Sequence, residues 1–173
     1  HIRRMSEVSY LMAQKLKLPE EECLLLKQAA PMHDIGKVAT PDAILLKPGR
    51  LDNDEMEVMK EHAHIGYTIM EGSNRPILQT AAIISQQHHE KFNGHGYPQG
   101  LKGDEIHIMA RIVAVADVFD ALTHKRCYKE AWPLEKVLSV MQQSSGSHFD
   151  PDVLKVLMDN IDDALAINSR YKD

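Results

Sequence analysis

Residues 105–122 read EIHIMARIVAVADVFDAL, a stretch in which apolar side chains dominate over more than four helical turns. The run is too long for an ordinary strand, and it predicts a helix that is buried on most of its surface. One carboxylate, Asp117, ends the apolar segment 112–117. A carboxylate in such surroundings is costly to bury unless it pairs with a cation or binds a metal. This stretch therefore predicts both a central helix and a candidate ligand.

The segments on both sides of this helix also have helical spacing, and none alternates strongly with period two. A helix over 2–16 should end before Pro19, where a second helix begins and runs towards Gly36. Pro31 should kink or split that second helix. Residues 93–104 contain four glycines and one proline and must form a loop. The predicted fold class is all-α. Further helices are expected from Thr40-Pro41, and over 52–72, 76–89, 133–143 and 150–167.

The composition excludes several classes of protein. A length of 173 residues suits one domain spanning 1–173, and a net charge of −5 argues against a partner that is a DNA or RNA polymer. No run reaches transmembrane length and no signal peptide is visible, so we expect a cytoplasmic location without membrane contact from this segment. Cys23 and Cys127 are expected as free thiols, with one disulfide as the alternative. Because the chain begins with His1, we expect a fragment of a longer protein.

Histidines stand at several predicted helix ends and interiors. There are ten in the chain, and three of the places that hold them are His33 with Asp34, His62, and the pair 88–89. Taken singly, each has a simpler interpretation: His62 as an ordinary surface or core histidine, and Asp117 as a cap or the partner of an arginine. Imidazoles and carboxylates from several helices of one bundle together are typical of a metal site.

With these positions, the sequence resembles the HD-GYP domains, a branch of the HD phosphohydrolase superfamily, over essentially its whole length. The string that ends in GYP is the most specific part of the resemblance. Asn93 departs from the pattern, since aspartate is common at this position, and this puts loop geometry and substrate preference in doubt. The matching segments are HDIGK at 33–37, KEH at 60–62, HHEKFNGHGYP at 88–98, ADVFDALT at 116–123 with Arg126 and Lys129 after it, and SHFDP at 147–151.

The resemblance implies a helical bundle of the HD-domain type with a metal site in its core. It implies two or three divalent metal ions, of which Asp34 would bridge two. The third depends on a position that lies before residue 1, so the number stays open. Iron is the usual metal of the family and manganese also occurs, while ligand chemistry alone suits iron, manganese or zinc. The implied metal ligands are His1, His33, Asp34, His62, His88, His89 and Asp117.

The resemblance also implies a reaction, the hydrolysis of cyclic di-GMP to linear pGpG, and it leaves open whether pGpG is cleaved further to GMP. Two metals about 3.5–4 Å apart can share a hydroxide that attacks phosphorus. Asp34 and Lys37 are the implied catalytic residues, and Glu90 and Asp120 are expected to orient ligands. Without the resemblance, Lys37 would be read as a solvated lysine and Tyr97 as loop packing. The implied substrate-binding residues are Lys37, Tyr97, Arg126 and Lys129.

Other functions stay open at this level. The substrate could be a mixed guanine–adenine cyclic dinucleotide or another nucleotide, because nothing in the sequence fixes base identity. The domain could be a catalytically silent signalling module that binds protein partners through its GYP loop, although the ligands that such members lose are present here. A di-iron oxygenase is a fourth interpretation. In longer members of the family, an upstream sensor or receiver domain commonly supplies regulation.

Overall fold

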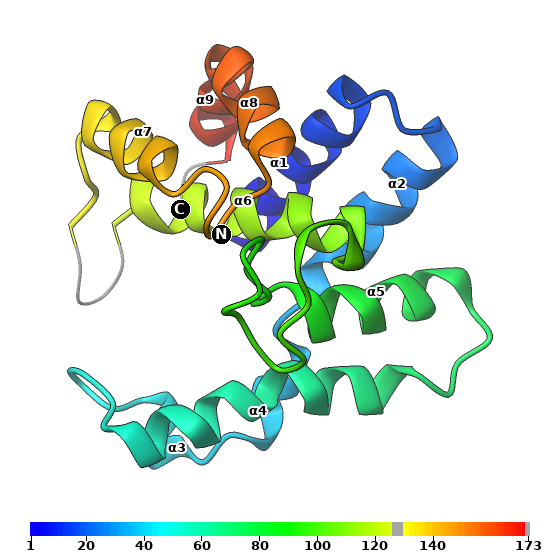
Figure 1. The fold of residues 1–173 in the computed structure, drawn as a ribbon, viewed down its shortest axis with the longest axis vertical. Coiled ribbons are helices and arrows are strands. Elements are labelled where there is room, and N and C mark those ends of the chain that lie inside the picture. Colours follow the sequence, from blue (N-terminus) through cyan, green and yellow to red (C-terminus); the bar gives the residue numbers. More distant parts are fainter. Residues whose placement is uncertain (126–129, 172–173) are drawn as a thin grey trace.

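The computed structural model describes residues 1–125 and 130–171, and these residues form helices joined by turns and loops, with isolated bridges but no strand. The prediction of an all-α fold is confirmed. Helix α6 (Ile108–Thr123) runs through the middle of the molecule, and α1 (Ile2–Lys15) packs across it. In Figure 1, the C-terminal helices lie on one side of α6, and the pair formed by α4 and α5 lies on the other.

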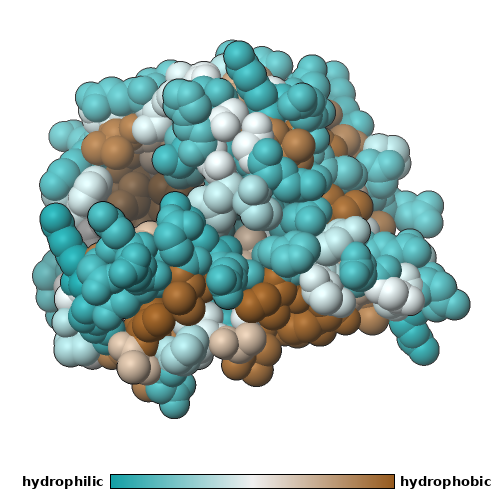
Figure 2. All heavy atoms as spheres, turned by 60° about the horizontal axis from the view of Figure 1, so that its bottom comes forward, coloured by the Kyte–Doolittle hydropathy of each residue, from teal (hydrophilic) through white to brown (hydrophobic). Residues whose placement is uncertain are grey.

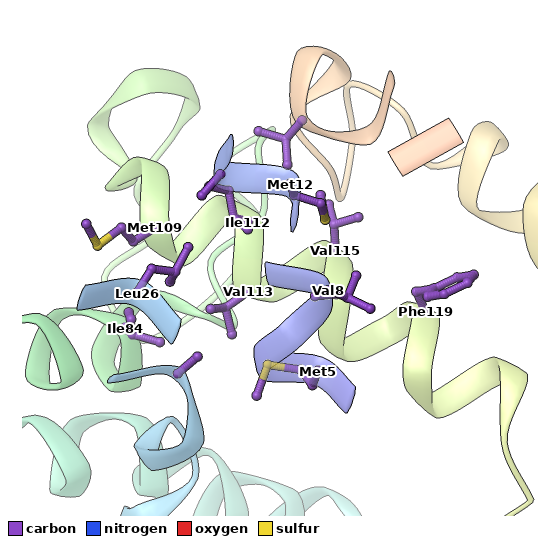
Figure 3. Close-up of a cluster of buried hydrophobic side chains, with 14 of the residues drawn as sticks. Met5, Val8, Met12, Leu26, Ile84, Met109, Ile112, Val113, Val115 and Phe119 are labelled. Carbon is purple, nitrogen blue, oxygen red and sulfur yellow. The ribbon is translucent and has the colours of Figure 1, made fainter. Parts of the chain in front are cut away.

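The hydrophobic core forms where α1 meets α6, as the apolar run 105–122 predicts. Figure 3 shows Met5, Val8 and Met12 of α1 beside side chains of α6, with Phe119 at the far end of the row. All of these side chains are almost completely buried. Burial of each side chain of this size contributes roughly 1.5–3 kcal/mol. Because α6 is buried along its length, the position of Asp117 within it is fixed by the core.

The second predicted helix is split, as Pro31 requires. Helix α2 (Glu20–Ala29) gives way to the 3-10 turns η1 (Ala30–Met32) and η2 (Ile35–Ala39). The next helix, α3 (Asp42–Leu45), begins later than predicted. Thr40 ends η2 with an extended backbone, and Pro41 precedes the helix as its N-cap instead of being its first residue. Proline has no N–H and tolerates an extended ψ, so it suits either position.

Helices α4 (Asn53–Met70) and α5 (Pro76–Gln87) form an antiparallel pair. A capping box begins α4, because Asp52 and Glu55 exchange hydrogen bonds of 2.8 Å in both directions. The pair is close-packed at Gly66, where an added Cβ would lie 2.0 Å from the Oγ atom of Ser85.

The C-terminal part differs from the sequence-based prediction in one respect. After α7 (Leu134–Gln143), the single helix expected over 150–167 is two helices, α8 (Pro151–Asp159) and α9 (Ile161–Arg170). The break is at Asn160, whose side-chain amide donates to the carbonyl of Val156 at 2.8 Å. Asparagine competes with helix continuation through such local bonds, and no glycine or proline marks the position.

The glycine-rich segment 93–104 is a loop, as predicted, and it is tied to the segment before α8. The N–H groups of Phe92 and Asn93 donate to the carbonyls of His148 and Ser147 at 3.1 and 2.9 Å. The ring of His148 stacks on Phe149 with centroids 4.2 Å apart. These contacts indicate a structural part for the SHFDP segment at 147–151.

None of the helices in the described ranges is both long and apolar enough to cross a membrane. Figure 2 shows the face that carries the lower helices of Figure 1. On this face, apolar patches interrupt a largely hydrophilic surface. The most exposed large apolar side chains are Val38 and Leu46, with 79% and 67% of their area accessible. Single exposed residues of this kind are ordinary on a protein surface.

Gly36 generates the first prediction, because an added Cβ would lie 1.9 Å from the carbonyl oxygen of His62. Backbone atoms cannot move aside as a side chain does, so Gly36→Ala should lower the free energy of unfolding by about 1–3 kcal/mol or more. The matched control is Gly72→Ala, since nothing lies within 4 Å of a Cβ there. Urea unfolding of metal-free protein measures both, and equal midpoints for the two variants would contradict this packing.

His148 generates a second prediction. Burial and the neighbouring Lys91 lower its pKa from 6.5 to about 4, so the folded protein resists a proton that the unfolded chain accepts. Protonation of the unfolded chain therefore lowers the free energy of unfolding as the pH falls from 6.5 towards 4. Above pH 6.5 this loss is absent. His148→Gln should flatten the decline of unfolding free energy over this range, whereas the exposed control His95→Gln should not. Identical pH slopes for His148→Gln and the parent protein would refute the assignment.

Candidate metal centre

The predicted ligands lie on separate elements that meet beside the buried helix α6. His1 precedes α1, His33 and Asp34 lie between η1 and η2, and Asp117 lies in α6. His62 projects from the middle of α4, while His88 caps α5 and His89 follows it. All seven predicted ligands come together in two adjoining groups, within each of which the ligand atoms are at most 4.8 Å apart. The first group is Asp34, His62, His88 and His89, and the second is His1, His33 and Asp117.

The carboxylate of Asp34 is the centre of the first group. Its Oδ1 atom lies 3.2 Å from Nε2 of His62 and 3.4 Å from Nε2 of His88. Its Oδ2 atom lies 3.3 Å from Nε2 of His33 and 2.8 Å from Nζ of Lys37. His33 joins the two groups, because the same Nε2 atom is 3.7 Å from Oδ1 of Asp117.

Backbone carbonyls fix the orientation of three of these rings. The Nδ1 atoms of His33 and His62 lie 2.9 and 2.6 Å from the carbonyl oxygens of Ala30 and Met59. The Nδ1 atom of His88 lies 2.9 Å from the carbonyl of Ser85. A ring that donates from Nδ1 to a carbonyl presents the lone pair of Nε2 on its other side. The three Nε2 lone pairs therefore point towards Asp34.

These inward-facing atoms have no hydrogen-bond partner among the described residues. The buried atoms concerned are Nε2 of His33, His62 and His88 and Oδ1 of Asp34. A buried polar atom without a partner costs about 1–3 kcal/mol, and four in one place make an unfavourable arrangement. A cation that accepts all their lone pairs removes this cost. Imidazole and carboxylate ligands suit iron, manganese or zinc, so the residues present fit the transition metals expected from the sequence.

Burial and mutual contact shift the protonation of these groups. Burial would raise the pKa of Asp34, but its contacts with His33, His62 and His88 lower it whenever those rings carry a proton on Nε2. Burial and the neighbouring histidines lower the pKa of His89 to about 2, and burial lowers the pKa of His88. The neutral imidazoles of His88 and His89 are ready to ligate a metal. Burial would lower the pKa of His33, but its contacts with Asp34 and Asp117 raise it.

Asp120 lies one turn after Asp117 and supports the second group. Its Oδ2 atom is 2.5 Å from Nδ1 of His1, while Nε2 of the same ring is 3.2 Å from Oδ1 of Asp117. Hydrogen bonds to Asp117 and Asp120 raise the pKa of His1 to about 9. The prediction that Asp120 orients a ligand agrees with this geometry. Arg4, which sequence reasoning missed, is 2% exposed and donates from Nε to Asp120 at 2.8 Å. Its position one helical turn after His1 is no signal by itself, because its partner Asp120 is 116 residues away.

Glu90 makes contacts other than those expected of it. Its carboxylate oxygens accept the N–H groups of Gln99 and Leu101 at 2.7 and 3.0 Å, so it holds the glycine-rich loop. No histidine is among its hydrogen-bond partners in the described part of the chain. Tyr97 of that loop stacks on His89, with centroids 4.8 Å apart and planes 17° from parallel. Glu90 thus acts on the centre through the loop that carries Tyr97.

A cavity of about 410 Å³ opens onto the centre. Asp34, Asp117 and Lys37 contribute to its lining, and His1 and His89 complete it. Lys37 brings its ammonium group to this cavity while paired with Asp34. The predicted substrate residues Arg126 and Lys129 lie outside the described residues. The cavity therefore combines ligand atoms, a cation and open access, which suits a phosphate-containing substrate.

The chain was compared with known proteins. A family model described as HD domain matches residues 1–153. The cyclic di-GMP phosphodiesterase response regulator RpfG of Xanthomonas campestris pv. campestris is 50% identical over 157 residues, which cover 91% of this chain and 42% of the relative. The 3'3'-cGAMP-specific phosphodiesterase 2 of Vibrio cholerae is 42% identical over 173 residues, which are 100% of this chain and 33% of that protein.

Among solved structures, the HDGYP protein Bd1817 of Bdellovibrio bacteriovorus superposes with a TM-score of 0.70. The superposition covers 94% of this chain and 51% of that one at 24% identity, so it bears on the fold alone. The chain spans less than half the length of the two enzymes to which it is similar.

The arrangement around Asp34 predicts a large effect of Asp34→Asn. This change keeps the shape of the side chain but removes the charge and adds N–H donors, so metal affinity should fall at least ~100-fold. Elemental analysis after dialysis and titration against a competing chelator measure the loss. The control Asp42→Asn removes an exposed carboxylate at the start of α3 and should leave metal content unchanged. Equal metal retention by the two variants would contradict a metal centre at Asp34.

Proposed function

The chain belongs to the HD domain family, and from this premise we propose that it is a metal-dependent phosphodiesterase of the HD-GYP branch that hydrolyses cyclic di-GMP to pGpG. One observation carries the proposal beyond family membership. The buried lone pairs around Asp34 lie beside an open cavity that also receives the ammonium group of Lys37. A metal-ligand set next to an accessible cation is what hydrolysis of an anionic diester requires.

The metal centre is proposed to be held by the seven residues of the two groups. When bound, divalent metals supply Lewis acidity towards phosphate oxygens and lower the pKa of water. We propose iron as the metal, with manganese as the alternative, because the His and carboxylate set accepts both. Two or three ions are proposed, and the two adjoining groups of ligand atoms support at least two.

Lys37 is proposed to stabilise charge on the scissile phosphate. Its side chain is 36% exposed, and its ammonium group pairs with Asp34. The ammonium group can therefore contact a substrate phosphate that lies beside the ligands. Tyr97 is proposed to line the substrate site, since its ring covers His89 at the edge of the centre. Arg126 and Lys129 are proposed to bind the phosphates of the substrate. Local cations of this kind are needed because the net charge of the chain is −5.

A mixed guanine–adenine cyclic dinucleotide is the second candidate substrate. The supporting observation is the 42% identity to a relative named as specific for 3'3'-cGAMP. Cleavage of pGpG onward to GMP is proposed as a second reaction at the same centre. The chain is proposed to act as one domain, in the cytoplasm where cyclic dinucleotides act as messengers, and under an upstream sensor or receiver domain. Binding of protein partners through the loop 93–104 remains a separate proposal.

Lys37→Ala tests the proposal. The parent protein, purified without oxygen and loaded with iron or manganese, should convert cyclic di-GMP to pGpG, and a chelator should abolish the conversion. Lys37→Ala should lower kcat about 100-fold, which is the usual cost of removing a group that stabilises transition-state charge. Its metal content should stay unchanged, because Lys37 lies outside the ligand set.

Chromatography of the products and elemental analysis of the same samples give both quantities. The control Lys155→Ala removes an exposed ammonium on α8, paired there with Asp159, and should leave kcat unchanged. Metal-loaded parent protein that binds cyclic di-GMP without cleaving it would overturn the enzyme and favour a silent signalling module. Oxygen consumption without phosphodiester cleavage would favour the oxygenase interpretation.

A further inference from the structure

A second cavity, of about 310 Å³, lies between α4 and the loop that carries Tyr97. We propose that it binds a guanine base of the substrate and that Glu61 is the residue that selects guanine. This inference rests on the proposed function, because it deepens the specificity of the same reaction. The lining residues are Glu57, Lys60, Glu61, His64, Tyr97 and Pro98.

The position of this cavity suits a base whose phosphate lies at the metal centre. Tyr97 is a wall of the cavity, and the same ring stacks on the candidate ligand His89 at 4.8 Å. The volume is at the lower end of the range for small-molecule sites. The rings of Tyr97 and His64 give it aromatic surface of the kind on which bases stack. A dinucleotide could therefore place a phosphate over the ligands and a base on the far side of Tyr97.

The charges in this cavity are not equivalent. Lys60 pairs with Glu57 at 2.9 Å, and its ammonium group lies 5.3 Å from the centroid of the Tyr97 ring. Glu61 is exposed and forms no ion pair or side-chain hydrogen bond with any residue that the structure describes. Lys60 thus neutralises one carboxylate and leaves the other available. The available carboxylate is an acceptor only, with two oxygens side by side.

Guanine matches this arrangement better than adenine does. Its N1–H and N2–H₂ groups are adjacent donors that a carboxylate can accept in a bidentate pair, and its O6 atom is an acceptor for a lysine. Adenine offers a lone pair at N1 and a single amino group beside it, so the carboxylate would face a lone pair. Adenine would displace water from the carboxylate without replacing its hydrogen bonds, and this loss discriminates against the wrong base.

A guanine site at Glu61 fixes the orientation in which a cyclic dinucleotide binds, as well as its affinity. Both cyclic di-GMP and 3'3'-cGAMP can place a guanine beside Glu61, whereas cyclic di-AMP cannot. A mixed substrate should then bind in one orientation only. Its first cleavage should yield one of the two linear isomers, pApG or pGpA, in large excess.

Glu61→Gln provides the test, because the amide keeps the size of the side chain but loses one acceptor and the charge. The parent protein should prefer cyclic di-GMP over cyclic di-AMP by about 100-fold or more in kcat/KM. Glu61→Gln should lower kcat/KM for cyclic di-GMP ~10-fold or more and yield both linear isomers from 3'3'-cGAMP. The control Glu21→Gln, an exposed carboxylate in the first turn of α2, should do neither.

Two further measurements separate this proposal from the proposed function. Hydrolysis of bis(p-nitrophenyl) phosphate, a diester without bases, reports the metal chemistry alone and should be equal in parent and Glu61→Gln. Calorimetric titration with GMP and with AMP reports base binding without turnover. Weaker binding of GMP but not of AMP to Glu61→Gln supports the guanine site even if no cyclic dinucleotide is cleaved. An unchanged ratio of the two affinities, or an unchanged isomer ratio in an active enzyme, overturns it.

Discussion

The candidate site depends on several hydrogen-bond acceptors that the fold places around one buried oxygen atom, Oδ1 of Asp34. Oδ1 of Asp34 faces Nε2 of His62 and His88 at 3.2 and 3.4 Å, and each of these rings is held at Nδ1 by a carbonyl of its own helix. The rings cannot turn without giving up those bonds. The fold therefore holds several acceptors together, and a cation is the partner that satisfies them. Helix ends and helix interiors, not flexible loops, supply most of the candidate ligands, so the packing of the helices sets their positions.

Close backbone approach makes this arrangement possible. The segment with Asp34 and Lys37 can lie directly on α4 because residue 36 is glycine, with the carbonyl of His62 where a side chain would begin. Gly66 plays the same part between α4 and α5. Gly96 has backbone atoms of His89 and Lys91 within 2.5 Å of its ideal Cβ position, which keeps the loop against the ligands. Three segments distant in sequence are thus held at contact distance by the absence of side chains.

Much of this could be predicted from the sequence, for identifiable reasons. Apolar spacing located α6 and the helices around it, and proline located the split before His33. The division at Asn160 was missed because a single asparagine gives no strong local signal. The resemblance to the family predicted that the ligands meet in one place. Residue spacing within one helix could not predict this, because it does not indicate which helices pack together. Arg4 was missed because a buried arginine is recognisable only once its partner Asp120, 116 residues away, is known.

The arginine that escaped prediction has a consequence for the whole domain. Arg4 reaches Asp120 with one nitrogen and the carbonyl of Tyr171, just after α9, with another at 2.9 Å. Asp120 also contacts His1. One network of polar contacts therefore joins the start of α1 to the residue that follows α9. A metal bound through His1 would therefore be coupled to the docking of α9, and such a coupling is reciprocal. Whatever loosens α9 should weaken the hold on the ion, and an ion in place should fasten α9.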